Sequence, residues 1–362
     1  MSRLRRLKAF GQSPWLDDLH RDLLEQQLPR LMSEDGICGI TSNPAILAKA
    51  VLEHASYRQR IAQMPPTCNS GLARYEALMV EDFRLAADRL RPVYEESGRL
   101  DGYVSLEIDP ALAHDADGSV REARRWWQRL ERPNVMIKIP ATDAGLVAIR
   151  RLLSEGVNVN ATLIFSPRRY AQVAVAWQAG IAERVSAGLP VGNVASVASF
   201  FVSRIETLAD RLLEEKAESR PDARRLQGRI AVAAAQVTYR EFRKRLATSA
   251  WEQLIIDGAI VQRPLWASTS TKNPDYSDVK YVDALIGPLT VTTLPLATIA
   301  AYRDHGQPAL RLENPDADLE QVLEELGTLG IDFAAMAARL EAEGLAKFQA
   351  AWEQLLKALE SA

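Results

Sequence analysis

The chain has little of what zinc sites, disulfide frameworks and membrane spans are built from. Its 362 residues include two cysteines and four histidines, with no C-x-x-C or H-x-x-x-H spacing, so a zinc site and a disulfide framework are both unexpected. So few cysteines fit a reducing compartment, and we expect a cytoplasmic protein. No apolar run reaches the roughly 18 residues of a membrane span. The basic start of the chain lacks the apolar core of a signal peptide.

Neither sign of charge dominates, since 44 Lys and Arg residues stand against 47 Asp and Glu residues. This balance predicts no general attraction to nucleic acid or to an anionic membrane, and an anionic substrate would need locally placed cations. Lysine itself is scarce, because only nine of the 44 basic residues are lysines. One of them, Lys138, lies inside the apolar run NVMIKIPA and is conspicuous there.

The composition, 47% hydrophobic and 25% charged, is that of an ordinary globular protein. Strand-like and helical stretches alternate along most of the chain, which predicts βα units around a parallel sheet. Eight strands favour a closed (β/α)8 barrel, an α/β TIM barrel, over an open sheet. The expected strands are Ser13–Leu16, Gly36–Ser42, Gly102–Ile108, Asn134–Ile139, Val157–Phe165, Val194–Phe201, Leu265–Ser268 and Leu289–Thr293.

Extra helices enlarge the predicted barrel, and we expect residues 1–362 to form one domain with a barrel core over 12–305. Periodicity predicts helices over Asp143–Ser154 and Pro167–Ala187, and a long arginine-rich helical insert over Ile205–Leu246 before the seventh strand. The extension 316–362 ends in an amphipathic helix that we expect to pack on the barrel exterior. A subunit contact is the alternative, and the sequence leaves monomer and homodimer open.

Polar residues occupy alternate positions of three strands, although both faces of a barrel strand are expected to be buried. A half-exposed antiparallel sheet would show this alternation too, but helical stretches follow these strands and speak against it. A buried charge network with a purely structural role is a second alternative. The residues that the alternation directs into the barrel are Glu107, Lys138, Asn160 and Thr162.

A buried lysine with such neighbours suits imine chemistry. A free lysine has a pKa of about 10.4, and apolar burial or a nearby cation lowers it toward about 7–8. The neutral amine can attack a carbonyl, and the iminium formed draws electrons from an adjacent C–C bond. Glu107 could transfer protons through a water held by Asn160 and Thr162. We expect no metal and no cofactor, and the chain carries no P-loop or G-x-G-x-x-G motif.

With these residues the sequence resembles the transaldolase family, and most of all its longer form from actinobacteria and some other bacteria. The likeness covers roughly residues 12–300 and keeps the motifs in order. The matching segments are Gly39–Ile46, Val104–Asp109, Met136–Thr142, Asn158–Ser166 and Ser199–Ile205.

The resemblance implies a (β/α)8 barrel whose fourth strand carries Lys138 as the Schiff-base nucleophile. Glu107 and Thr162 would hold the catalytic water. Asp17, rather than Asp18, would be the acid and base for C–C cleavage. The implied substrate-binding residues are Asn43 and Asn160 for hydroxyls, Ser199, Phe201 and Arg204 at the sixth strand, and Ser268 and Lys272 at the seventh.

The seventh strand departs from the pattern of the shorter family members. They resemble S-F-R-N here, whereas Ser268–Asn273 is two residues longer and has lysine in place of the arginine. Arg204 would bind the substrate phosphate, and Lys272 is the candidate for the second cation. A solvated loop lysine is the alternative for Lys272.

The implied activity, in the pentose phosphate pathway, moves a dihydroxyacetone unit from sedoheptulose 7-phosphate to glyceraldehyde 3-phosphate. Erythrose 4-phosphate and fructose 6-phosphate are the products, so the partners would be phosphorylated ketoses and aldoses. One alternative is a fructose-6-phosphate aldolase, which releases dihydroxyacetone. Such enzymes are much shorter and tend to have glutamine for Glu107 and tyrosine for Phe201. The other alternative is a non-catalytic barrel that binds sugar phosphates, which the intact catalytic positions disfavour.

Overall fold

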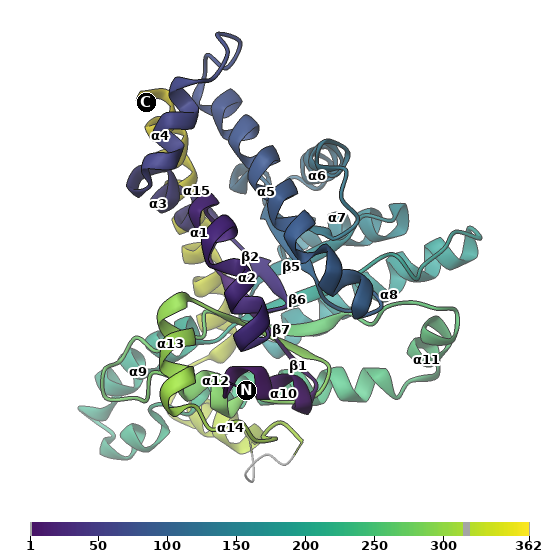
Figure 1. Cartoon of the computed structure of the whole chain (residues 1–362). Helices are drawn as coiled ribbons and strands as arrows, with labels where there is room; N and C mark the ends of the chain where they lie inside the picture. Colours follow the sequence, from purple (N-terminus) through teal and green to yellow (C-terminus); the bar gives the residue numbers. More distant parts are fainter. Residues whose placement is uncertain (1, 314–318, 362) are drawn as a thin grey trace.

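Eight parallel strands close into a barrel in the computed structural model, which describes residues 2–313 and 319–361 (Figure 1). Each strand pairs with the next in sequence, and the first pairs with the last from Gln12 beside Thr290 to Leu16 beside Leu294. The predicted (β/α)8 barrel is confirmed. The strands are β1 (Gln12–Asp17), β2 (Gly39–Thr41), β3 (Tyr103–Glu107), β4 (Val135–Pro140), β5 (Val159–Ile164), β6 (Ser196–Phe201), β7 (Arg263–Ala267) and β8 (Thr290–Leu294).

Helices cover the outside of the barrel. Those predicted after the fourth and fifth strands begin where Thr142 and Ser166 cap them through their side chains. The α-helices up to the sixth strand are α1 (Arg21–Gln26), α2 (Leu28–Arg30), α3 (Pro44–Glu53), α4 (Ala55–Ala62), α5 (Gly71–Glu96), α6 (Ala116–Leu130), α7 (Asp143–Glu155) and α8 (Pro167–Ser186). Short 3-10 or π turns are η1 (Leu4–Phe10), η2 (Leu31–Asp35) and η3 (Pro110–Leu112). No helix within residues 2–313 and 319–361 is long and apolar enough to cross a membrane.

The predicted helical insert before the seventh strand divides into separate helices. Pro221 starts a short turn after the first of them, and Gly228, at φ +73°, redirects the chain before the next. The insert comprises α9 (Ser203–Ala217), η4 (Pro221–Leu226), α10 (Ile230–Leu246) and α11 (Ser249–Ile256). Later helices are α12 (Lys280–Ala284), α13 (Leu296–His305), α14 (Leu319–Thr328) and α15 (Phe333–Ser361). The predicted start of the C-terminal extension, Asp316, lies outside the described residues.

The C-terminal helix α15 packs against α3, α5 and α9, and it also contacts β5 (Figure 1). Its apolar face is buried, and Trp352 meets Tyr75 edge to face with ring centroids 4.6 Å apart. At Gly344 the helix comes close to the barrel, since a Cβ there would lie 3.1 Å from Leu163. The helix packs on the barrel exterior as expected, and in addition it reaches the end of β5.

A buried ion pair closes the amino-terminal end of the barrel. Arg263 Nη2 lies 3.0 Å from Asp101 Oδ1, and Asp101 also accepts hydrogen bonds from Ser13 Oγ at 2.7 Å and Trp15 Nε1 at 3.1 Å. Burial opposes ionisation of Asp101, but Arg263 and these hydrogen bonds outweigh it and lower the pKa. With this end filled, the opposite end of the barrel, where strands run into loops, is free for chemistry.

Candidate active site

Lys138 stands on β4 with its side chain inside the barrel, and the residue is only 5% exposed. Its Nζ lies 3.3 Å from Glu107 Oε2 and donates a hydrogen bond to the carbonyl oxygen of Ser42 at 2.9 Å. Strand register produces this arrangement, because Glu107 pairs with Lys138 across β3 and β4, and Lys138 pairs with Asn160 across β4 and β5. The structure thus brings together the polar residues that strand alternation directs inward.

Glu107 is buried beside this lysine. Burial raises the pKa of its carboxyl group, although the Lys138 ammonium opposes the rise. Apart from that ion pair, its oxygens have no hydrogen-bond partner in the part of the chain that the structure describes, and neither does Thr162 Oγ1. Buried polar atoms without protein partners are typical of positions that contact water or substrate.

A cavity of about 180 Å³ opens above Lys138 at the carboxyl end of the barrel. Most of the residues that the sequence indicates line it, namely Asp17, Asn43, Lys138, Thr162, Ser199, Phe201, Arg204, Ser268 and Lys272. Glu107 and Asn160 lie behind this wall. Asn160 accepts a hydrogen bond from Ser199 Oγ at 2.6 Å and donates one to Ser105 Oγ at 3.1 Å. These bonds fix the amide beside the cavity.

Sequence reasoning missed several residues of the cavity wall, which are Thr41, Leu265, Ala267, Ser270, Thr293, Pro295 and Phe348. Thr41 lies inside the Gly39–Ile46 motif, and Thr293 is a polar residue near the end of a strand. Both could therefore have been predicted as residues of the site. Phe348 comes from α15, where it looks like any other apolar residue of an amphipathic helix. No local pattern distinguishes it from the helix core.

Asp17, at the end of β1, opens into the cavity and is otherwise surrounded by protein. Burial raises the pKa of Asp17 to about 6, although Lys138 opposes the rise. A carboxyl group of this kind can accept and donate protons near neutral pH. Its neighbour Asp18 is not part of the cavity wall and interacts with His20 instead.

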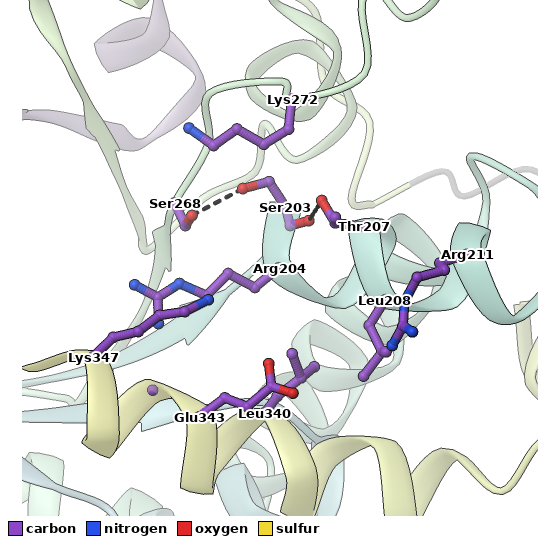
Figure 2. Close-up of a pocket in the computed structure, with 11 residues that line it drawn as sticks. Ser203, Arg204, Thr207, Leu208, Arg211, Ser268, Lys272, Leu340, Glu343 and Lys347 are labelled. Carbon is purple, nitrogen blue, oxygen red and sulfur yellow. Dashed lines mark hydrogen bonds between the residues drawn. The ribbon is translucent and has the colours of Figure 1, made fainter.

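Two cationic side chains, those of Arg204 and Lys272, lie at the outer end of the cavity (Figure 2). The Arg204 guanidinium lies 5.1 Å from the ring centroid of Phe201 and 5.8 Å from that of Phe348, and burial lowers the pKa of Arg204. Lys272 Nζ donates to Ser270 Oγ at 2.7 Å. Lys272 is exposed, as a loop lysine would be, and it also lines the cavity. This end of the cavity can therefore accept an anion.

Comparison with known proteins gives matches over nearly the whole chain. The model of the Transaldolase/Fructose-6-phosphate aldolase family matches residues 14–359. "Transaldolase 2" of a Nostoc species is 44% identical over 99% of this chain and 97% of its own. Proteins named transaldolase from Frankia alni and Mycobacterium bovis are each 42% identical over 98% of this chain and 95% of theirs.

We predict that Asp17→Asn stabilises the fold above pH 6. Below about pH 4 the carboxyl group is protonated in both states, whereas above its folded pKa of about 6 the folded state carries the cost of a buried charge. The rise from 3.8 to about 6 corresponds to about 3 kcal/mol in the free energy of unfolding. Urea unfolding should show the gain at pH 8 and little change at pH 4.

The matched control is Asp275→Asn, which neutralises an aspartate on an exposed loop and should leave the unfolding free energy unchanged at both pH values. Equal stability of Asp17→Asn and wild type at pH 8 would contradict the electrostatic description of Asp17.

Proposed function

The chain belongs to the transaldolase/fructose-6-phosphate aldolase family, and on that basis we propose that it acts as a transaldolase through a Schiff base on Lys138. A transaldolase is a transferase of the pentose phosphate pathway. It moves a dihydroxyacetone unit from sedoheptulose 7-phosphate to glyceraldehyde 3-phosphate and yields erythrose 4-phosphate and fructose 6-phosphate. One observation carries the proposal: a lysine amine inside the barrel, 3.3 Å from a buried carboxylate, at the base of a cavity with cations at its outer end.

Imine formation requires Lys138 to lose a proton and then attack C2 of the ketose. The Glu107 carboxylate at 3.3 Å can take this proton, because burial favours its protonated form. A C–N bond forms, and the former carbonyl oxygen takes up protons and leaves as water. The free hydrogen-bonding atoms of Glu107 and Thr162 suit them to hold that water, both for its departure and for the later hydrolysis.

Cleavage of the C3–C4 bond uses the iminium as an electron sink. Asp17 accepts the proton of the C4 hydroxyl, the C3–C4 electron pair moves into the iminium, and an enamine remains on Lys138 while the aldose leaves. With a pKa of about 6, Asp17 can return the proton when the acceptor aldehyde adds to the enamine. Two carboxyl groups thus serve different steps, the buried Glu107 for the imine and the partly buried Asp17 for the C–C bond.

Amide and hydroxyl groups around the lysine would orient the dihydroxyacetone unit. Asn43 Oδ1 accepts hydrogen bonds from the backbone amides of Ala45 and Ile46 at 3.0 and 3.1 Å, so its Nδ2 is directed elsewhere and can donate to a substrate hydroxyl. Asn160 is fixed by its bonds to Ser105 and Ser199. Fixed donors favour reaction because little rearrangement precedes the transition state.

The phosphate of the substrate would occupy the outer end of the cavity. Arg204 and Lys272 supply positive charge there, and Ser268 Oγ, 2.8 Å from Ser203 Oγ, adds a hydroxyl. Arginine suits the buried position because its planar guanidinium can bind a phosphate through two parallel hydrogen bonds. The distance between this end and Lys138 then selects ketoses by length.

The proposal includes a cytoplasmic location. Cys38 and Cys68 are both free thiols, which fits a reducing compartment. Phosphorylated sugars, the substrates proposed for this cavity, are small charged metabolites of the same compartment.

We predict that borohydride traps an intermediate on Lys138. When the enzyme is incubated with fructose 6-phosphate and reduced, peptide mass mapping should find a reduced dihydroxyacetone adduct on that residue. Lys138→Ala should lose the label and at least about a thousandfold of its turnover, with its circular dichroism unchanged. The control Lys49→Ala removes an exposed lysine and should retain both label and activity. A label on another lysine, or none, would rule out the proposed nucleophile.

A second prediction separates transfer from aldol release. With fructose 6-phosphate alone, the wild-type enzyme should release dihydroxyacetone far more slowly than it transfers the unit when erythrose 4-phosphate is added and sedoheptulose 7-phosphate forms. Glu107→Gln and Phe201→Tyr introduce the residues typical of the aldolases, and each should raise the ratio of release to transfer. Product analysis by chromatography measures both rates. Free dihydroxyacetone from the wild type at the rate of transfer would favour the aldolase.

A further inference from the structure

A second cavity of about 380 Å³, whose lining residues are drawn in Figure 2, adjoins the cavity above Lys138. Arg204, Ser268 and Lys272 line both cavities. One wall of this outer cavity comes from α9 and the loop after β7. The opposite wall comes from α15, including Gly344 and Lys347. The C-terminal helix therefore borders the end of the site where the substrate phosphate is proposed to bind.

Positive charge dominates the outer cavity. Its wall contains Arg204, Arg211, Lys272 and Lys347 against a single carboxylate, Glu343. Glu343 is already paired with a residue outside the cavity, because Arg339 Nε donates to its Oε1 at 2.7 Å and lowers its pKa. Lys347 and Arg211 add to that lowering only as more distant charges. A concave surface with this excess of cations concentrates anions.

Two of the four cationic side chains at this cavity, Arg204 and Lys347, make no hydrogen bond or ion pair among residues 2–313 and 319–361. The Nη1 atom of Arg204 is buried as well. Lys272, in contrast, donates to Ser270. Since buried polar atoms in native proteins are normally satisfied, the orphan Arg204 donor points to a ligand at this position.

The helix α15 comes close to Arg204 at a glycine, Gly344. A Cβ at Gly344 would lie 3.4 Å from Arg204 Nη1, so the glycine keeps that side of the guanidinium open. Lys347 follows almost one turn later, and Figure 2 shows its side chain extending from α15 toward Arg204. Phe348, the next residue, places its ring centroid 5.8 Å from the same guanidinium. Gly344, Lys347 and Phe348 thus all meet the phosphate end of the site.

We propose that Lys347 is a phosphate-binding residue, a third cation beside Arg204 and Lys272, and that α15 is thereby part of the substrate site. The inference rests on the proposed transaldolase function and extends it to a residue remote in sequence from the barrel strands. An ammonium on a flexible stem supplies charge and three rotatable donors, which suits a phosphate at the rim of a cavity. Because Lys347 is exposed, its contribution should fall as salt rises.

The test is Lys347→Gln, which keeps the length of the side chain and removes its charge. We expect KM for fructose 6-phosphate and for erythrose 4-phosphate to rise about tenfold in low salt, with kcat changed less than about twofold. The inhibition constant of inorganic phosphate should rise by a similar factor. Unphosphorylated glyceraldehyde as the acceptor should keep its wild-type KM. The control Lys357→Gln alters an exposed lysine further along the same helix and should change none of these values.

Three outcomes would overturn the assignment of Lys347. They are an unchanged KM for phosphorylated substrates with unchanged phosphate inhibition, an equal rise in KM for glyceraldehyde, and a tenfold effect that persists undiminished at high salt. Failure of the proposed function is distinguishable, because the wild type would then show no transfer. In that case calorimetric titration with inorganic phosphate still tests the residue, and equal affinity of wild type and Lys347→Gln would refute it.

Discussion

The arrangement of the site depends on an ion pair between the Lys138 ammonium and the Glu107 carboxylate inside a closed parallel barrel. Lys138 and Glu107 lie on neighbouring strands with their charged atoms 3.3 Å apart, and both residues are almost fully buried. A lone charge in such a place costs several kcal/mol, so each group requires the other. Burial still raises the pKa of Glu107. The pair can therefore exchange a proton at the position where a substrate carbonyl would arrive.

Other charged groups and the C-terminal helix are arranged around this buried pair. The ion pair of Arg263 and Asp101 fills the amino-terminal end of the barrel, and the cavity opens at the carboxyl ends of the strands. Asp17 meets that opening at the end of β1, where partial burial raises the pKa of its carboxyl group. The C-terminal helix crosses the same end, with Phe348 on the cavity wall beside Arg204. In the proposed function, the reaction takes place on the barrel axis and the substrate phosphate binds at the rim.

The barrel and its centre could be predicted from the sequence because the signals there are local. Period-two alternation placed Glu107, Lys138 and Asn160 on one face, and strand pairing then made them neighbours. The contribution of α15 could not be predicted this way. Phe348 and Lys347 reach Arg204 across more than a hundred residues of chain, and the amphipathic pattern of the helix identifies its buried face without identifying what that face covers. Contacts of that kind depend on tertiary packing.

A covalent bond between Lys138 and the substrate ketone should be visible in a crystal structure of Asp17→Asn with fructose 6-phosphate. That variant should form the imine and stop there, because it lacks the base for C–C cleavage. We expect continuous electron density from Lys138 Nζ to C2 of the sugar, with the phosphate in contact with Arg204. A sugar phosphate bound in the cavity with C2 free of Lys138 would contradict this expectation.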